Sequence, residues 1–438
     1  MTETAPITER RYLVPFVLVT SLFFLWALGV NLNDVLIPHL KKAFSLTDFR
    51  SSLIQSAFFG GYFLAALPAG WLMERVGYKK GILLGLLICA TGAFLFIPAA
   101  MIRVYGVFLF ALFVMACGQC FLEVAANPYV TILGPPETSE RRLNIAQSFN
   151  SVGAVITPFL GAAFILSGIE YSPAQLGAMS AAQVQAYRVS EANMVKVPYL
   201  VIAAIFLGVA ALIYFSSLPE VRAEAGSGES TDTEAKFRGL LAHPHLLKGV
   251  LAQFFYVGAQ VGVASFIIRF AQHTIPGIHE KSAAHYLQMH LVGFMLGRFA
   301  GSAIMKIIPA PKLLSLFAAG SLACVLVVLF ATGTAPVWAI VLIGFFPSIM
   351  FPTIFALSLK NLGPYTKLGS SLLVMSIIGG AVCPAMMGII SDASSIQRAF
   401  VVPLICYLYV LFFAMRGYKP ESVTYMDKAL EPVPSEAK

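Results

Sequence analysis

Charged residues are scarce in this chain. Asp, Glu, Lys and Arg make up 11% of its 438 residues, against roughly 25% in soluble domains. Hydrophobic residues make up 58% of the sequence, and its mean hydropathy is +0.81. Most side chains must therefore face lipid or other apolar helices rather than water, and the composition predicts an all-α integral membrane protein.

The sequence also lacks the usual signs of a disulfide scaffold, a metal site or an ATPase. Its six cysteines fall within hydrophobic segments, and the Cys117-Gly-Gln-Cys120 spacing lies mid-helix, which favours packing over redox chemistry. No G-x-x-x-x-G-K-S/T loop occurs. Neither a catalytic cluster nor a large extramembrane domain is evident. We therefore expect neither an enzyme nor a receptor, and no metal or other cofactor.

The positive charge of the chain does not indicate a nucleic-acid partner. The formal net charge is +8, but the Lys and Arg residues lie in short loops and form no basic patch with interleaved aromatics. Membrane topology explains this distribution better.

Membrane-spanning segments can be placed wherever about 20 apolar residues follow one another. No small-residue cleavage site follows the first segment, which indicates a retained helix rather than a signal peptide. We expect twelve spans, near residues 12–38, 53–73, 81–101, 104–132, 144–167, 195–217, 248–272, 283–305, 312–331, 335–359, 368–391 and 398–416.

An even number of spans places both termini on one side of the membrane. The loops on that side hold most of the Lys and Arg residues, including Arg75, Lys79, Lys80 and Arg142. The positive-inside rule then predicts that both termini are cytoplasmic, in the plasma membrane, which is the inner membrane of a Gram-negative cell.

A linker divides the chain into two repeated halves. Residues 219–243 are rich in Glu, Ser, Gly and Thr and cannot bury a core, which predicts six-helix bundles at 1–218 and 244–438. The run from Gly153 to Pro158 is echoed by Gly379 to Pro384. Two parallel repeats with a site between them are typical of alternating-access transporters. The other long loop, 168–194, is interpreted as a solvated external connector.

Two carboxylates, Asp34 and Glu123, stand out because they alone lie deep inside long apolar runs. An ionisable group at membrane depth is costly and marks a pathway or a proton relay. Glu123 is expected to be protonated or paired, while Asp34, nearer a helix end, could be a solvated acid. Each carboxylate shares a helix face with an amide, Asn31 at i−3 of Asp34 and Asn127 at i+4 of Glu123.

Further polar stripes lie on the fifth and seventh segments. Gln147 and Asn150 form one stripe, and Tyr256 and Gln260 form the other. Amides and carboxylates among aromatic side chains are the lining that a sugar requires. The alternative is that these amides only bond helices together.

The run from Gly70 to Lys80 resembles the signature loop of the major facilitator superfamily, G-x-L-x-D-R-x-G-x-K-K, with Glu74 in place of Asp. We expect Gly70, Glu74, Arg75, Gly77 and Lys80 to control conformation at the cytoplasmic face. The alternative is an ordinary positive-inside turn.

A closer resemblance extends from residue 12 to 416. Six motifs occur in order, and they are Asn31-Leu-Asn33-Asp34 with Pro38, Phe121 to Pro128, Ala146 to Ser151, Tyr256 to Gln260, Pro352 to Phe355 and Lys360 to Gly363. Together they resemble the fucose:H⁺ symporter branch of that superfamily. This implies a monomeric, proton-driven L-fucose importer that needs no cofactor. It also implies that Glu123 and Asp34 couple protons and that Asn31, Gln147 and Asn150 line the cavity.

Two positions depart from that branch. Phe351 stands where it has Tyr, and Ala264 stands where it has Trp. These changes could shift selectivity toward glucose, galactose or N-acetylglucosamine. A drug or metabolite exporter would share the Gly70 loop but is not expected to reproduce all six motifs.

Overall fold

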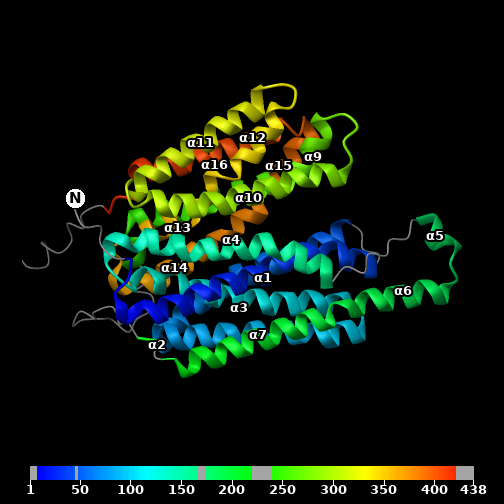
Figure 1. Ribbon diagram of the computed structural model, residues 1–438, viewed down its shortest axis with the longest axis horizontal. Helices are drawn as coiled ribbons and strands as arrows, with labels where there is room; N and C mark the ends of the chain where they lie inside the picture. The colour runs from blue at the N-terminus through cyan, green and yellow to red at the C-terminus, as the bar shows by residue number, and fades with distance from the viewer. Residues whose placement is uncertain (1–6, 45–47, 165–172, 217, 220–238, 421–438) are drawn as a thin grey trace, which may run out of the picture.

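The computed structural model describes residues 7–44, 48–164, 173–216, 218–219 and 239–420. Helices account for nearly all of these residues, and no strand occurs among them (Figure 1). Most of the 219–243 linker lies outside the described residues.

The helices before the linker cover the first six predicted spans. They are α1 Leu13–Phe44, α2 Asp48–Ile102, α3 Tyr105–Ile132, α4 Ser139–Phe164, α5 Pro173–Ala178, α6 Ala181–Met194 and α7 Lys196–Phe215.

The helices after the linker cover the other six. They are α9 Pro244–Thr274, α10 Glu280–Ile304, α11 Ala310–Phe330, α12 Ala335–Ile343, α13 Met350–Leu359, α14 Thr366–Met375, α15 Gly379–Ala393 and α16 Val401–Phe412.

Two predicted spans share one long helix, α2. The chain turns between them at Gly77, whose φ of 83° and ψ of 174° are not helical. This backbone conformation is open to glycine because it has no Cβ. Gly77 of the signature loop is therefore needed for the turn itself.

Two other spans are interrupted by short 3₁₀ turns. Phe346–Ile349 separates α12 from α13, and Ser376–Ile378 separates α14 from α15. Nine helical segments of the described part, some of which join two consecutive helices, are long and apolar enough to cross a membrane. Helices α4 and α10 are not among them, because polar residues interrupt their apolar runs.

The 168–194 loop is more structured than a solvated connector. Its described part forms α5 and α6 (Figure 1). Ser180 caps α6 in a capping box with Gln183, and the Ala-rich sequence that follows has high helix propensity. Val195 keeps a helical conformation, so α6 leads almost directly into α7.

Helices pack into two groups that meet along a central interface. In the first group α2 contacts α3 and α7, and α1 contacts α4. In the second group α9 contacts α15, α16 and α13. The groups meet where α14 packs on α2 and α3 and where α10 packs on α4, so α4 and α10 lie in the middle of Figure 1.

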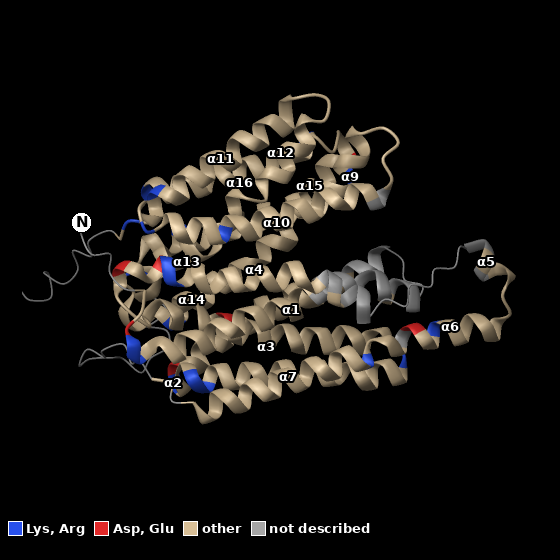
Figure 2. Ribbon diagram, viewed as in Figure 1, with Lys and Arg blue, Asp and Glu red and all other residues tan. Residues whose placement is uncertain are grey.

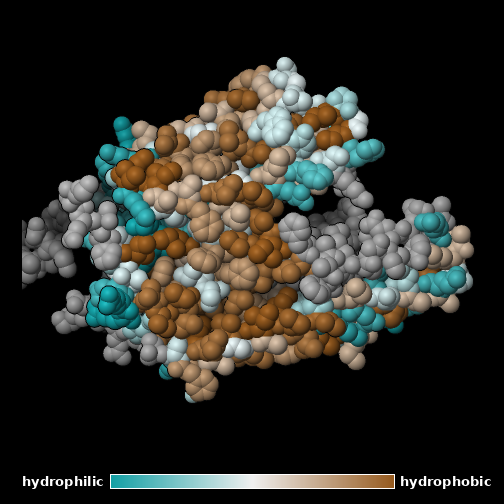
Figure 3. All heavy atoms as spheres, in the orientation of Figure 1, coloured by the Kyte–Doolittle hydropathy of each residue, from teal (hydrophilic) through white to brown (hydrophobic). Residues whose placement is uncertain are grey.

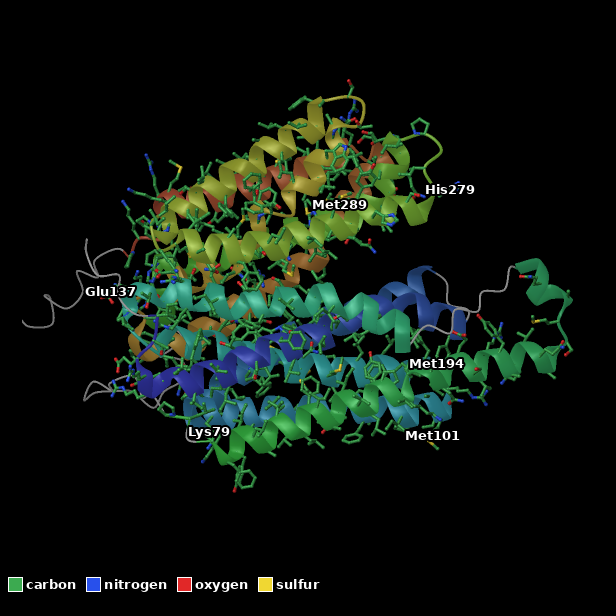
Figure 4. All side chains as sticks on the ribbon, viewed as in Figure 1. Lys79, Met101, Glu137, Met194, His279 and Met289 are labelled. Atoms are coloured by element: carbon green, nitrogen blue, oxygen red, sulfur yellow. The ribbon has the colours of Figure 1, made fainter. Side chains whose placement is uncertain are left out.

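The two ends of the molecule differ in their charge. Lys79 and Glu137 lie at one end, which we call the Glu137 end, and His279 lies at the other, the His279 end (Figure 4). Both ends of the described chain lie near the Glu137 end (Figure 1). Most of the Lys and Arg residues coloured in Figure 2 gather there, while few coloured residues lie in the middle of the molecule.

The outer surface between the ends is apolar. Large hydrophobic side chains such as Phe215, Phe330 and Ile389 are 84%, 79% and 70% exposed, and Figure 3 shows a broad brown surface over the helices. A monomeric soluble protein rarely exposes such an area, so this surface faces lipid.

Candidate functional site

Glu123 lies inside the bundle on α3. Its side chain is 6% exposed. Gln119 and Asn127 are one turn away on the same helix and are completely buried, which makes a polar stripe at i−4, i and i+4. Tyr62, Asn127 and Arg298 lie close enough to the Glu123 carboxyl to influence it electrostatically, and the Asn127 amide nitrogen has no hydrogen-bond partner among the described residues. A buried carboxylate needs such partners, because water is excluded from it.

Arg298 on α10 is the buried cation that faces Glu123. Its side chain is 4% exposed. Its Nε donates to the Ser348 carbonyl at 2.9 Å, and its Nη1 donates to the Gln147 side-chain oxygen at 3.1 Å. The guanidinium also lies 4.6 Å from the centre of the Phe294 ring. Together these protein contacts hold the positive charge of Arg298 in place.

The sequence analysis did not single out Arg298, which the structure places within α10. The available signal was a lone cation inside the predicted span 283–305. Such a residue is as costly at membrane depth as Glu123.

Gln147 connects Asn127 to Arg298. Its Nε2 donates to Asn127 Oδ1 at 3.1 Å, and its oxygen accepts from Arg298. Asn127, Gln147 and Arg298 are therefore joined by hydrogen bonds that cross from the first group of helices to the second, and Glu123 adjoins this buried network through its charge interaction with Arg298. The sequence predicted three of these four residues, and the structure brings those three together.

Two other predicted sugar-binding amides bond to the backbone of α1. Asn31 Nδ2 donates to the Ala27 carbonyl at 2.7 Å, and Asn150 Nδ2 donates to the Phe23 carbonyl at 3.2 Å. Their donors are used within the bundle in this conformation, as in the helix-bonding alternative, while their carbonyl oxygens can still accept from a hydroxyl. Asp34 lies in α1, but its side chain is outside the described residues.

The second polar stripe lies on α9. Tyr256 is completely buried, its ring centre is 6.2 Å from that of Phe351, and it interacts electrostatically with Arg298. Its hydroxyl has no hydrogen-bond partner among the described residues. Gln260, two turns from Gln253 on the same helix, is half-buried. Tyr256 thus adjoins the network, and Gln260 lies farther along α9.

The signature loop lies at the Glu137 end. Gly70 packs so tightly that a Cβ there would collide with the hydroxyl of Ser371 on α14. Arg75 lies 3.8 Å from the centre of the Trp71 ring, and Lys80 is exposed. Glu74 is half-buried and has interaction partners. Gly70 therefore contacts the second group of helices directly, whereas Arg75 contacts its own helix.

The two groups of helices are bonded to each other at this end. Lys367 Nζ donates to the Met73 carbonyl at 3.0 Å, and Ser370 Oγ donates to the Val124 carbonyl at 2.9 Å. The Glu137 end is thus closed in this conformation.

The sequence profile of the Major Facilitator Superfamily matches residues 19–376. The chain belongs to the major facilitator superfamily. This membership, in a superfamily of transporters, confirms the predicted fold class of twelve transmembrane helices in two six-helix repeats.

The chain resembles two known transporters over most of their length. It is 44% identical over 409 residues to the L-fucose-proton symporter of Escherichia coli, covering 93% of each chain. It is 42% identical over 419 residues to the glucose/galactose transporter of Brucella abortus, covering 95% of this chain and 97% of the other.

A solved structure of this superfamily shows the same fold. The E. coli transporter FucP, crystallised in the outward conformation, superposes with a TM-score of 0.87 at 44% identity, covering 93% of this chain and 99% of the other. Closure at the Glu137 end is compatible with that conformation.

Proposed function

We propose that the chain is a proton-coupled sugar symporter that imports L-fucose by alternating access. The observation that carries the proposal is that Glu123 and Arg298, buried on different groups of helices, interact through their charges, beside hydrogen bonds that join Arg298 to Gln147 and Gln147 to Asn127. A titratable carboxylate that interacts with a cation across a moving interface can link protonation to conformation. The name of the E. coli relative supports the same function.

The charge of Glu123 would control the network. While Glu123 is ionised, its attraction to Arg298 stabilises the arrangement seen here, since opposite charges interact strongly where water is excluded. A proton that arrives from outside neutralises Glu123 and removes this attraction. Neutralisation also lowers the free-energy cost of keeping the Glu123 carboxyl buried in an intermediate that is closed at both ends and contains no water. Asp34 is proposed as the second acidic residue of the pathway. The proton gradient supplies the energy, and no cofactor takes part.

The sugar would bind beside this network. Neutral hydroxyls are recognised by amides, by tyrosine hydroxyls and by aromatic surfaces. The proposed sugar-binding residues are Asn31, Asn127, Gln147, Asn150, Tyr256 and Gln260. The Tyr256 hydroxyl is buried beside Arg298, where it could also bond to a sugar hydroxyl.

Alternating access would move two bundles, residues 1–218 and 244–438, about the site, with 219–243 as a flexible linker. We propose that the Glu137 end is cytoplasmic, because Lys and Arg gather there (Figure 2). Contacts of the signature loop would help to hold this end closed. Gly70 would allow the close packing and Gly77 the turn. Glu74, Arg75 and Lys80 would form charge contacts. We propose that the monomer carries out the cycle.

Glucose or galactose is the second candidate substrate. Phe351 lies against Tyr256 and stacks on Phe355 with ring centres 6.0 Å apart, and it offers no hydroxyl at this point. The B. abortus relative is named for glucose and galactose. A change in the lining of the second bundle would change which sugar fits without changing the proton chemistry.

Uptake into proteoliposomes tests the proposal. Labelled L-fucose is added under an imposed inward proton gradient and competed with unlabelled glucose, galactose and N-acetylglucosamine. Gradient-driven accumulation of L-fucose supports the function as stated, and accumulation of another sugar alone moves the substrate to the second candidate. Efflux against the gradient would indicate the exporter alternative, and no sugar movement would overturn the proposal.

A further inference from the structure

Three side chains of α4 reach across the interface to the second group of helices. Each makes one polar contact, and each contact has a different partner. The contacts are Glu140 Oε1 with Lys360 Nζ at 3.0 Å, Asn144 Nδ2 with Thr353 Oγ1 at 3.1 Å, and Gln147 Oε1 with Arg298 Nη1 at 3.1 Å.

These contacts form one line along the helix. Positions 140, 144 and 147 follow the i, i+4, i+7 spacing of a single helix face, and at 1.5 Å per residue they span about 10 Å. Of their partners, Lys360 directly follows α13, Thr353 lies within α13 and Arg298 lies within α10. The line therefore runs from the Glu137 end inward to the buried network.

Burial makes these contacts costly to break in the closed state. Glu140 is 5% exposed, and Asn144 and Thr353 are completely buried. Lys360 is partly solvated, with 44% of its side chain exposed, but its carbonyl is fixed by a ring nitrogen of His245 at 2.9 Å. A buried carboxylate that loses its partner must be rehydrated, so separation is favourable only if water enters.

The innermost contact shares its guanidinium with the proton-coupling site. Arg298 donates to Gln147 and also interacts with the charge of Glu123. When Glu123 is neutral, the position of Arg298 is held by one attraction fewer. Its bond to Gln147 can then break first, and the Asn144 and Glu140 contacts follow toward the Glu137 end.

We propose that these three contacts form an α4 lock, which holds the Glu137 end closed and which protonation and sugar binding open from the inside outward. Glu140, Asn144, Lys360 and Thr353 are then positioning residues for the transport cycle, although none of them touches the sugar or the proton. The proposal rests on the proposed function, since it assigns the lock to the transport cycle.

Charge reversal tests the outermost contact. Glu140→Lys and Lys360→Glu each place like charges together, and the double variant restores an ion pair with reversed sign. The matched control is Lys312→Glu, the same charge change at an exposed residue near the same end. All proteins are compared in proteoliposomes with the sugar that the wild type accumulates.

The lock predicts a change in apparent KM rather than in maximal rate. A smaller outward-facing population raises the apparent KM for external sugar in proportion, by about fivefold for each single variant, a factor typical of conformational coupling. The double variant should return to within about twofold of the wild type. A lower maximal rate at unchanged KM, or a double variant no better than the single ones, would show only structural damage and overturn the proposal.

Hydrogen exchange separates this outcome from a failure of the proposed function, because it needs no sugar. In Lys360→Glu, amides of residues 139–147 should exchange faster, and the double variant should restore slow exchange. If the charge-reversed proteins do not fold, the same readout applies to Thr353→Val, which removes one hydroxyl at nearly constant volume. Unchanged exchange in the folded variants would refute the lock even if transport is confirmed.

Discussion

Replacement of Glu123 by Gln should uncouple sugar movement from the proton gradient. Glutamine has nearly the same shape and can still hydrogen-bond with Tyr62 and Asn127, but it carries no charge toward Arg298. It therefore mimics the protonated state permanently. We expect a folded protein that exchanges sugar across the membrane but cannot concentrate it.

The size of the effect is worked out for one proton per sugar, carried by Glu123, the carboxyl that interacts with Arg298 among the described residues. One proton per sugar at a gradient of one pH unit supplies about 1.4 kcal/mol, which supports about tenfold accumulation. Wild-type proteoliposomes should approach that ratio, whereas the Glu123→Gln protein should stop at a ratio of about one. Counterflow of labelled against unlabelled sugar should continue.

The assay compares both proteins with Glu137→Gln as a control. Glu137 is exposed at one end of the molecule, so the same substitution there should leave accumulation unchanged (Figure 4). If the Glu123→Gln protein still accumulates sugar about tenfold, Glu123 is not the coupling group and the reasoning is wrong.

Three further substitutions test other parts of the account. Arg298→Ala should cost about 3–5 kcal/mol, because it removes the hydrogen bonds to Ser348 and Gln147 as well as the countercharge of Glu123. It should also abolish coupling, and thermal unfolding in detergent together with uptake measures both effects. Phe351→Tyr should strengthen competition by L-fucose relative to galactose by roughly tenfold if the new hydroxyl bonds to the sugar. If competitive uptake gives the same ratio of L-fucose to galactose inhibition as in the wild type, Phe351 does not set selectivity. Gly70→Ala should weaken closure of the Glu137 end and change the KM for external sugar, because the added Cβ meets the Ser371 hydroxyl. Ser371→Gly in the same chain should restore the wild-type KM. If it does not, this contact is not the cause of the change.

Much of the fold could be predicted from the sequence, because membrane spans leave a strong signal of length and hydropathy. All twelve predicted windows fall on helices. The breaks inside the spans 335–359 and 368–391 were missed, since a short 3₁₀ turn changes no hydropathy. The helix α6 was also missed, because polar sequence in a long loop was interpreted as a connector, although Ser180 and Gln183 provide a capping signal.

The site was predicted less completely than the fold. The position of Glu123 could be inferred because a carboxylate in an apolar run is conspicuous. Its pairing with Arg298 could not, because the two residues are far apart in the sequence and only tertiary packing of α10 on α4 brings them together. Attention to buried acids alone also hid the cation that balances them. The proposed roles of the other polar residues stay predictions until they are tested.

Proton movement in response to sugar tests the central claim most directly. Proteoliposomes that contain a trapped pH indicator are given external L-fucose with no imposed gradient. Symport predicts that sugar entering down its own gradient carries protons with it and acidifies the lumen, and that Glu123→Gln abolishes the acidification but not the sugar entry. Entry of sugar into wild-type vesicles with no change in lumenal pH would contradict proton coupling.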